Sequence, residues 1–293
     1  MNRAAVSCIA ILLSASSACS QASSSTIRIA GAPSMEVCTR RLTEWYHNTH
    51  PAAAFTVTGG GPNKGISALI DGRAEIVRSS RQALGGEISA LRDKHGKSFV
   101  QIPIATEVAG ILVNPSNSVQ NLSIFDLRQI LSGSVKNWKQ IGGPDAPITI
   151  YGRDDSSDSR DFIEGEFMGD EGISSAAHRY PKNSEVYAAV ARDKNAIGFA
   201  PVDLALGQQI RFIGIKPSSS APAIAPTTEN IRDHRYPLIR PLYLIFAGEP
   251  SGDLKAFAEW VLSTQGQLVV EAAEFWPLGA PDREKGKNLL ASR

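Results

Sequence analysis

The chain has 293 residues, which is enough for one large domain or two medium ones with a substantial core. Hydrophobic residues make up 42% of it and charged residues 20%, the usual balance of a soluble globular protein. The formal net charge is only +1, so no overall field attracts nucleic acid or an anionic membrane. Any affinity for anions must therefore come from a local site.

The first residues have the layout of an export signal. A positively charged start at Arg3 is followed by an apolar stretch at 4–13 and then by small polar residues. This order is typical of a secretory signal, and the apolar stretch is too short for a stable membrane anchor. Two alternatives stay open: a signal peptide of residues 1–22, or a lipoprotein signal of residues 1–18 with lipidation of Cys19. Either places the protein in the periplasm or outside the cell.

Strand-like and helix-like patterns alternate along the rest of the chain, which indicates an α/β fold. Strands are expected at residues 26–30, 55–58, 75–77, 100–104, 111–114, 148–151, 197–200 and 242–246. Such folds place ligands in the loops that lead from strands into helices, and four loops qualify: residues 31–34, 59–65, 79–81 and 153–159. Residues 283–293 are polar and basic, and we expect a flexible tail there.

The loop at 153–159 has the composition of an anion site. Arg153 is followed by Ser157, Asp158 and Ser159 and then by an apolar run that begins a helix. A strand, a hydroxyl-rich turn and a helix start offer N–H and hydroxyl donors to an anion, and the guanidinium of Arg153 adds a planar pair of donors. Alternatively, Asp158 or Ser159 is simply the N-cap of the helix.

A series of short motifs resembles the phosphate-binding receptors of phosphate ABC importers. The motifs are residues 31–35, 65–66, 71–76, 79–81, 122–143, 153–159, 195–199, 236–242 and 265–267. Each motif is weak by itself, but their order and spacing over residues 26–278 are specific.

The resemblance implies two α/β lobes joined by a two-strand hinge, with the ligand in the cleft between them. The first lobe would combine residues 26–104 with 236–282, and the second would be residues 105–235. The implied function is capture of inorganic phosphate or a similar tetrahedral oxyanion, with closure read by an ABC permease in the inner membrane. A phosphatase that uses the same anion loop is the enzymatic alternative, but no metal-ligand set or nucleophile–base pair in the sequence supports it. We therefore expect a monomer with no enzymatic activity, no cofactor, no bound metal and no nucleic-acid partner.

The resemblance also implies site residues. The expected phosphate contacts are Ser34, Ser80, Arg153, Ser157, Asp158 and Ser159. Asp155 matches the acid that orients the arginine in this family.

The sequence departs from the family's pattern at the expected site. Pro33 and Pro62 stand where relatives have hydroxyl residues, and proline offers neither a hydroxyl nor an N–H. Asp158 replaces a glycine, so it either faces solvent as an N-cap or accepts the proton of a protonated phosphate. These departures leave a second function open: a diverged sensor or cell-surface interaction protein of the same fold with weak or no phosphate binding.

Overall fold

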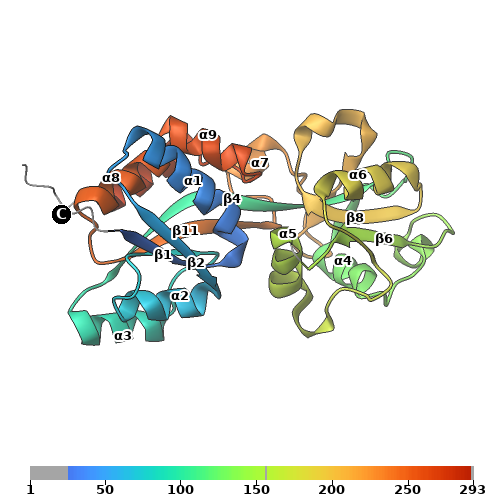
Figure 1. Ribbon diagram of the computed structural model, residues 1–293. Helices are drawn as coiled ribbons and strands as arrows, with labels where there is room; N and C mark the ends of the chain where they lie inside the picture. The colour runs from blue at the N-terminus through green and yellow to red at the C-terminus, as the bar shows by residue number, and fades with distance from the viewer. Residues whose placement is uncertain (1–25, 156, 292–293) are drawn as a thin grey trace, which may run out of the picture.

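The computed structural model describes residues 26–155 and 157–291. Its elements form two groups on either side of the region where β4 (Phe99–Val113) and β11 (Ile239–Ala247) run side by side (Figure 1). We call these groups the first lobe and the second lobe. The molecule is therefore an α/β protein of two lobes joined through two strands, as the sequence predicted.

The first lobe is built on a sheet with the order β2-β1-β3-β11-β4. Its remaining strands are β1 (Ile27–Gly31), β2 (Phe55–Gly60) and β3 (Ile76–Ser79). Its helices are η1 (Pro33–Met35), α1 (Glu36–Thr49), α2 (Gly61–Ile70), α3 (Gly85–His95), α8 (Gly252–Val261), α9 (Thr264–Ala272) and α10 (Ala280–Leu290). Figure 1 shows α1, α8 and α9 on one face of this sheet and α2 and α3 on the other.

The second lobe continues the sheet from β4 in the order β8-β6-β7, with β9 pairing β4 separately. Its strands are β6 (Thr149–Arg153), β7 (His178–Tyr180), β8 (Ala196–Pro201) and β9 (Arg211–Phe212), beside a small sheet of β5 (Asn121–Ser123) and β10 (Gly214–Lys216). Its helical segments are α4 (Ile124–Leu131), η2 (Trp138–Ile141), α5 (Asp158–Phe162), η3 (Ile163–Met168), η4 (Gly169–Glu171), α6 (Asn183–Arg192), η5 (Leu204–Gln209) and α7 (Thr228–Arg232).

Local sequence explains where several of these helices begin. Ser123 accepts a hydrogen bond from the Asp126 backbone N–H while the Asp126 carboxylate accepts from the Ser123 N–H, so a capping box starts α4. Ser263 caps α9 in a similar way through the Gly266 N–H. Within residues 26–155 and 157–291, no helix is both long enough and apolar enough to cross a membrane.

The secondary structure differs from the sequence-based expectation at β4 and at α10. The strands expected at 100–104 and 111–114 are one continuous strand, β4, because the residues between them are buried on both faces and show no alternation. The flexible tail expected at 283–293 is wrong for residues 283–290, which belong to α10. Leu290 is buried there against the core of the first lobe, which gives this helix an apolar anchor.

The lobe boundaries expected from the sequence stay a prediction. Tyr236 and Leu238 were expected in the first lobe, but they pack in the core cluster of the second, with Trp138 and Phe162. The chain therefore passes from the second lobe back into the first at the start of β11.

Gly152 provides a test of the packing that holds the anion loop. It is buried in β6 immediately before Arg153, and an added Cβ would overlap the ring of Phe199 on the neighbouring strand β8. We expect Gly152→Ala to lower the free energy of unfolding by about 1–3 kcal/mol, measured by urea denaturation. Gly86→Ala on α3 is the control, because its Cβ would meet no atom. Equal urea midpoints for Gly152→Ala and Gly86→Ala would contradict the close packing of Gly152 against Phe199.

Candidate functional site

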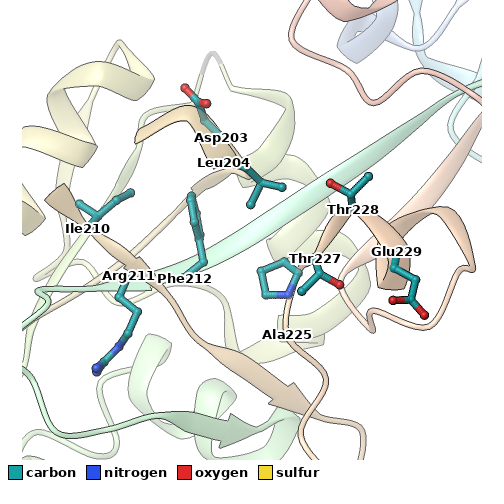
Figure 2. A pocket seen from close by; sticks show the side chains of 10 residues that line it. Asp203, Leu204, Ile210, Arg211, Phe212, Ala225, Thr227, Thr228 and Glu229 are labelled. Carbon is teal, nitrogen blue, oxygen red and sulfur yellow. The ribbon is translucent and has the colours of Figure 1, made fainter. Parts of the chain in front are cut away.

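Two hollows are candidates for a ligand site. The larger, about 600 Å³, lies in the second lobe between the segment after β8 and the start of α7. Figure 2 shows Leu204 and Phe212 on one side of it and Thr227, Thr228 and Glu229 on the other. None of the described residues that line it belongs to the predicted anion site, so its chemistry does not match the sequence prediction.

The second hollow, about 270 Å³, is a cleft between the lobes. The first lobe contributes α1 and the segment after α9, the crossing strand β4 contributes its middle, and the second lobe contributes the anion loop and the start of α6. The lining residues are Val37, Arg41, Glu107, Val108, Arg153, Ser157, Asn183, Pro201, Ala273, Glu274 and Phe275. Two of the predicted contacts, Arg153 and Ser157, therefore line an interlobe cleft.

The guanidinium of Arg153 is held by the segment between β7 and α6. Its Nε donates to the Tyr180 carbonyl oxygen (3.2 Å), its Nη2 to the Pro181 carbonyl oxygen (2.8 Å), and its Nη1 to the side-chain oxygen of Asn183. All three acceptors are neutral, and no carboxylate of the described residues forms an ion pair with Arg153. Its positive charge is therefore fixed in position and available to the cleft.

Asp155 does not orient Arg153 in this structure, contrary to the expectation. It is 81% exposed and lies 3.4 Å from Arg160 Nε and 3.6 Å from Arg179 Nη1. Arg179 lies on β7 and Arg160 in the middle of α5, and Asp155 forms its ion pairs with these two arginines. Three neutral acceptors, on Tyr180, Pro181 and Asn183, perform the positioning that was expected of Asp155.

Ser157 is 4% exposed and begins the turn into α5. Its backbone N–H donates to the Asp154 carbonyl oxygen (3.2 Å), and its own carbonyl oxygen accepts from the Asp161 N–H (3.1 Å). Asp158 and Ser159 are the first residues of α5, but their side chains lie outside the described part of the structure. Their predicted contacts with phosphate stay predictions.

Ser34 and Ser80 belong to loops at one edge of the first lobe. Ser34 is buried within η1, while Ser80 is half-buried just after β3. Both loops follow neighbouring parallel strands, since Gly31 of β1 is in register with Arg78 of β3. Because α5 packs against η1, the turn of Ser34 and the anion loop meet across the two lobes.

The sequence analysis did not identify Arg78, whose buried side chain holds this region in place through hydrogen bonds. Its side chain is fully buried, with Nε donating to the Ala32 carbonyl oxygen (2.9 Å) and Nη2 to the Thr58 carbonyl oxygen (3.1 Å). Nη2 also lies 3.4 Å from the carboxylate of Glu36. The signal in the sequence that could have identified Arg78 was the presence of an arginine inside the apolar strand at residues 76–79.

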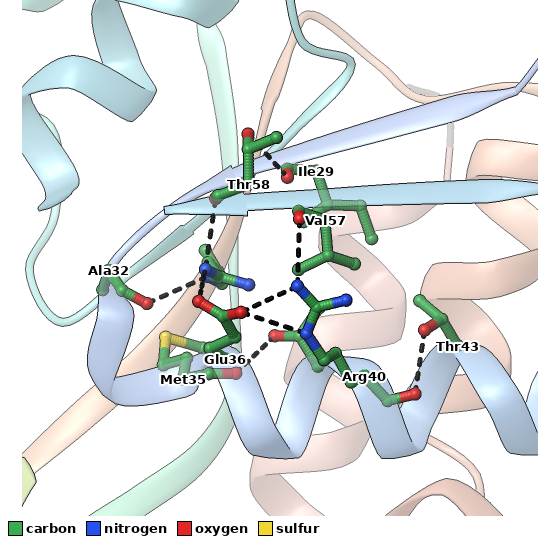
Figure 3. A network of polar contacts seen from close by, with 10 residues as sticks. Ile29, Ala32, Met35, Glu36, Arg40, Thr43, Val57 and Thr58 are labelled. Atoms are coloured by element: carbon green, nitrogen blue, oxygen red, sulfur yellow. Dashed lines mark hydrogen bonds and ion pairs between the residues drawn. The ribbon is translucent and has the colours of Figure 1, made fainter. Parts of the chain in front are cut away.

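Glu36 links the same region to α1. Figure 3 shows its carboxylate between Ala32 and Thr58 on one side and Arg40 on the other. The hydrogen bond from Arg40 is the main cause that lowers the pKa of Glu36, with burial acting in the opposite direction and Arg78 adding to the lowering. Glu36 therefore stays ionised beside the loop of Ser34.

A buried ion pair lies where the two strands cross between the lobes. Arg240 of β11 is in register with Glu107 of β4, and its Nε is 2.7 Å from Glu107 Oε2. Burial raises the pKa of Glu107 to about 7; Arg240 opposes the shift, while Asp161 and Glu166 add to it. The guanidinium of Arg240 also lies 4.7 Å from the centre of the Phe162 ring in α5. The sequence signal was a charge inside each of two apolar strands.

A polar bridge joins the lobes at the cleft that Glu107 also lines. Asn183 accepts from Arg153 and donates through Nδ2 to the Glu274 carboxylate (2.7 Å). Glu274 follows α9 in the first lobe and has a left-handed backbone conformation, with φ of 65°. Arg153 is thus connected across the cleft through one amide side chain.

We expect this bridge to hold the lobes together in the ligand-free protein. Asn183→Asp keeps an acceptor for Arg153 but places a second carboxylate against Glu274. A repulsion of roughly 1 kcal/mol would shift the ratio of open to closed molecules about fivefold. Small-angle X-ray scattering should then show a larger radius of gyration.

Asn137→Asp is the matched control for this variant. It also places two carboxylates together, since Asn137 donates to Asp145 (3.0 Å), but both residues lie in the second lobe. An unchanged radius of gyration for Asn183→Asp, or the same change in both variants, would contradict the bridge.

Comparison with known proteins assigns this architecture to a family. Residues 16–265 match the family model described as the PBP superfamily domain, and the chain belongs to that family. The family comprises solute-binding proteins of ABC transporters and not enzymes. The match agrees with the resemblance to phosphate-binding receptors seen in the sequence.

Individual relatives are similar in sequence or in fold. The chain is 25% identical over 244 residues to the phosphate-binding protein PstS of Bacillus subtilis (strain 168), covering 82% of this chain and 76% of that protein. The crystal structure of an ABC-type phosphate transport receptor from Vibrio cholerae superposes with a TM-score of 0.72 at 26% identity, covering 86% and 99% of the two chains. A possible phosphate binding protein from Planctomyces limnophilus DSM 3776 superposes with a TM-score of 0.80 at 21% identity, covering 91% and 97%, and supports the fold alone.

Proposed function

We propose that this protein binds inorganic phosphate, or a similar tetrahedral oxyanion, in the cleft between its lobes and delivers it to an ABC importer. One observation carries the proposal: Arg153 and Ser157, from the loop that resembles the family's anion loop, both line this cleft. Relatives that are named as phosphate-binding proteins support the choice of ligand.

In the proposed complex, Arg153 supplies the positive charge and Ser157 a hydroxyl donor. Ser34 and Ser80 would approach the oxyanion from the first lobe, and Asp158 and Ser159 from the start of α5. Movement of the first lobe (residues 26–104 and the chain from the start of β11 onward) against the second (from residue 105 to the start of β11) would enclose the ligand. The closed monomer is then the form that the permease recognises.

A second candidate function is supported by the charges of the cleft. Two carboxylates, Glu107 and Glu274, line it, and Pro33 removes one N–H donor from the loop of Ser34. Both features oppose a dianion. They favour a diverged sensor or cell-surface interaction protein with weak or no phosphate binding, and titration calorimetry with phosphate distinguishes the two functions.

Arg153 is the residue whose loss should affect binding most. We expect Arg153→Ala to weaken phosphate binding by about 10–100-fold, because a charge-assisted hydrogen bond contributes about 1.5–3 kcal/mol. Ser157→Ala should cost about tenfold or less, since its hydrogen bond is neutral. Titration calorimetry measures both constants.

Arg179→Ala is the control for Arg153→Ala. It removes a positive charge from the same lobe, but Arg179 faces Asp155 and does not line the cleft. Its phosphate affinity should stay within about twofold of the unmodified protein, as expected for an exposed charge. If Arg153→Ala lowers only the melting temperature and leaves the affinity unchanged, Arg153 is a structural residue of the 180–183 segment.

The proposed function requires export, which the expected signal at residues 1–22 would provide. This signal and Cys19 lie outside the described residues, so lipidation is a separate expectation. Metabolic labelling with a radioactive fatty acid tests it: label that disappears in Cys19→Ala indicates a lipoprotein, whereas an unlabelled parent protein indicates a freely secreted form.

A further inference from the structure

Glu107 occupies a special position at the base of the cleft. It lies in the middle of β4 and lines the cleft with Arg153 and Ser157, although only 5% of its surface is exposed. Its Oε2 accepts a hydrogen bond from Arg240. Among the described residues, no donor reaches its other oxygen, Oε1.

The groups around Glu107 carry both signs of charge. Arg240 faces it from β11, and the negative residues Asp161 and Glu166 act on it from α5 and η3. Across the cleft lie the charged residues Arg41 of α1, Arg153 of β6 and Glu274 after α9. With Glu107 ionised, the cleft lining therefore holds two positive and two negative side chains.

We propose that Glu107 is a specificity-determining residue of the cleft, which takes up a proton when an oxyanion binds and donates the resulting O–H to that oxyanion. This inference rests on the proposed function. It assigns to the cleft a preference for an oxyanion together with one proton, rather than for a bare dianion.

The physical reason is the cost of placing like charges together at a buried site. An oxyanion bound by Arg153 and Ser157 adds negative charge beside a carboxylate that is already shielded from water, which favours the neutral carboxylic acid. The proton comes from solvent and attaches to Glu107, while Oε2 continues to accept from Arg240. A repulsive acceptor thereby becomes a donor to the ligand.

This uptake determines how affinity depends on pH. The pKa of Glu107 is about 7 without ligand, and a bound oxyanion raises it further. Below both values Glu107 is protonated in both states, so it adds no pH dependence. Between the two values binding takes up nearly one proton, and affinity falls by up to about tenfold for each unit rise in pH.

The test is calorimetric titration with inorganic phosphate, comparing the unmodified protein with Glu107→Gln, which retains an acceptor for Arg240. Titrations in two buffers of different ionisation enthalpy give the protons taken up. Phosphate's own titration is the same for both proteins, so their difference isolates Glu107. From about pH 7 to about pH 9, we expect the affinity of the unmodified protein to fall about tenfold more than that of Glu107→Gln.

Glu274→Gln is the matched control. It removes one carboxylate from the exposed rim of the same cleft, so it should shift the affinity by a similar factor at both pH values. Equal proton uptake and equal pH slopes in the unmodified protein and Glu107→Gln would overturn the inference. If none of the proteins binds phosphate at any pH, the proposed function itself fails.

A measurement on the unmodified protein does not depend on how Glu107→Gln folds. Carbon-13 NMR of the glutamate side-chain carboxyls follows the titration of Glu107 directly. We expect saturating phosphate to move this titration to higher pH, and a titration that stays in place overturns the inference.

Discussion

The pairing of β4 with β11 is the constraint on which the rest of the molecule depends. Most of β4 pairs with β11 in the first sheet, and its last five residues pair with β8 in the second. Both lobes therefore share the strand β4, and the register of β4 with β11 is linked to its register with β8. A ladder of this kind bends more easily than it slides, so the proposed movement between the lobes would occur as bending near residues 105–109 of β4 and at the start of β11.

The position of Arg153 depends on this frame and on a choice of neutral partners. Arg78 and Arg160 each have a carboxylate partner, so their charges are partly compensated within the protein. The acceptors of Arg153 are two backbone carbonyl oxygens and one amide oxygen. Neutral acceptors fix the guanidinium without cancelling its charge, which is what an anion site needs in a protein whose net charge is only +1.

The sequence predicted the architecture and singled out the loop of Arg153 and Ser157, which lines the cleft, because those features have local signals. Alternating strand and helix patterns gave the α/β class, and the loop of Arg153 and Ser157 was recognisable from its hydroxyl-rich composition after a strand. The partners of Arg153 could not be predicted in this way. The 180–183 segment is brought to it by the pairing of β6 with β7, a contact between strands about 25 residues apart.

The buried charges escaped prediction for a related reason. Glu107 and Arg240 are 133 residues apart, and each alone is merely a charge within an apolar strand. Only the antiparallel register makes them partners. The same holds for Asn183 and Glu274, which are 91 residues apart and meet only when the lobes face each other. Sequence reasoning recognises a site carried by one loop, but not one assembled from two lobes.

The anion loop and the hinge are connected by direct contact. Ser157 begins the turn into α5, and four residues later the backbone N–H of Asp161 donates a hydrogen bond to the carbonyl oxygen of this serine. The next residue, Phe162, places its ring beneath the guanidinium of Arg240, which in turn holds Glu107. Because α5 has only five residues, few backbone torsions lie between Ser157 and Phe162 that could absorb a displacement of Ser157. The proposed ligand contact at one end of α5 and the strands β4 and β11 at the other are thus connected through a single short helix.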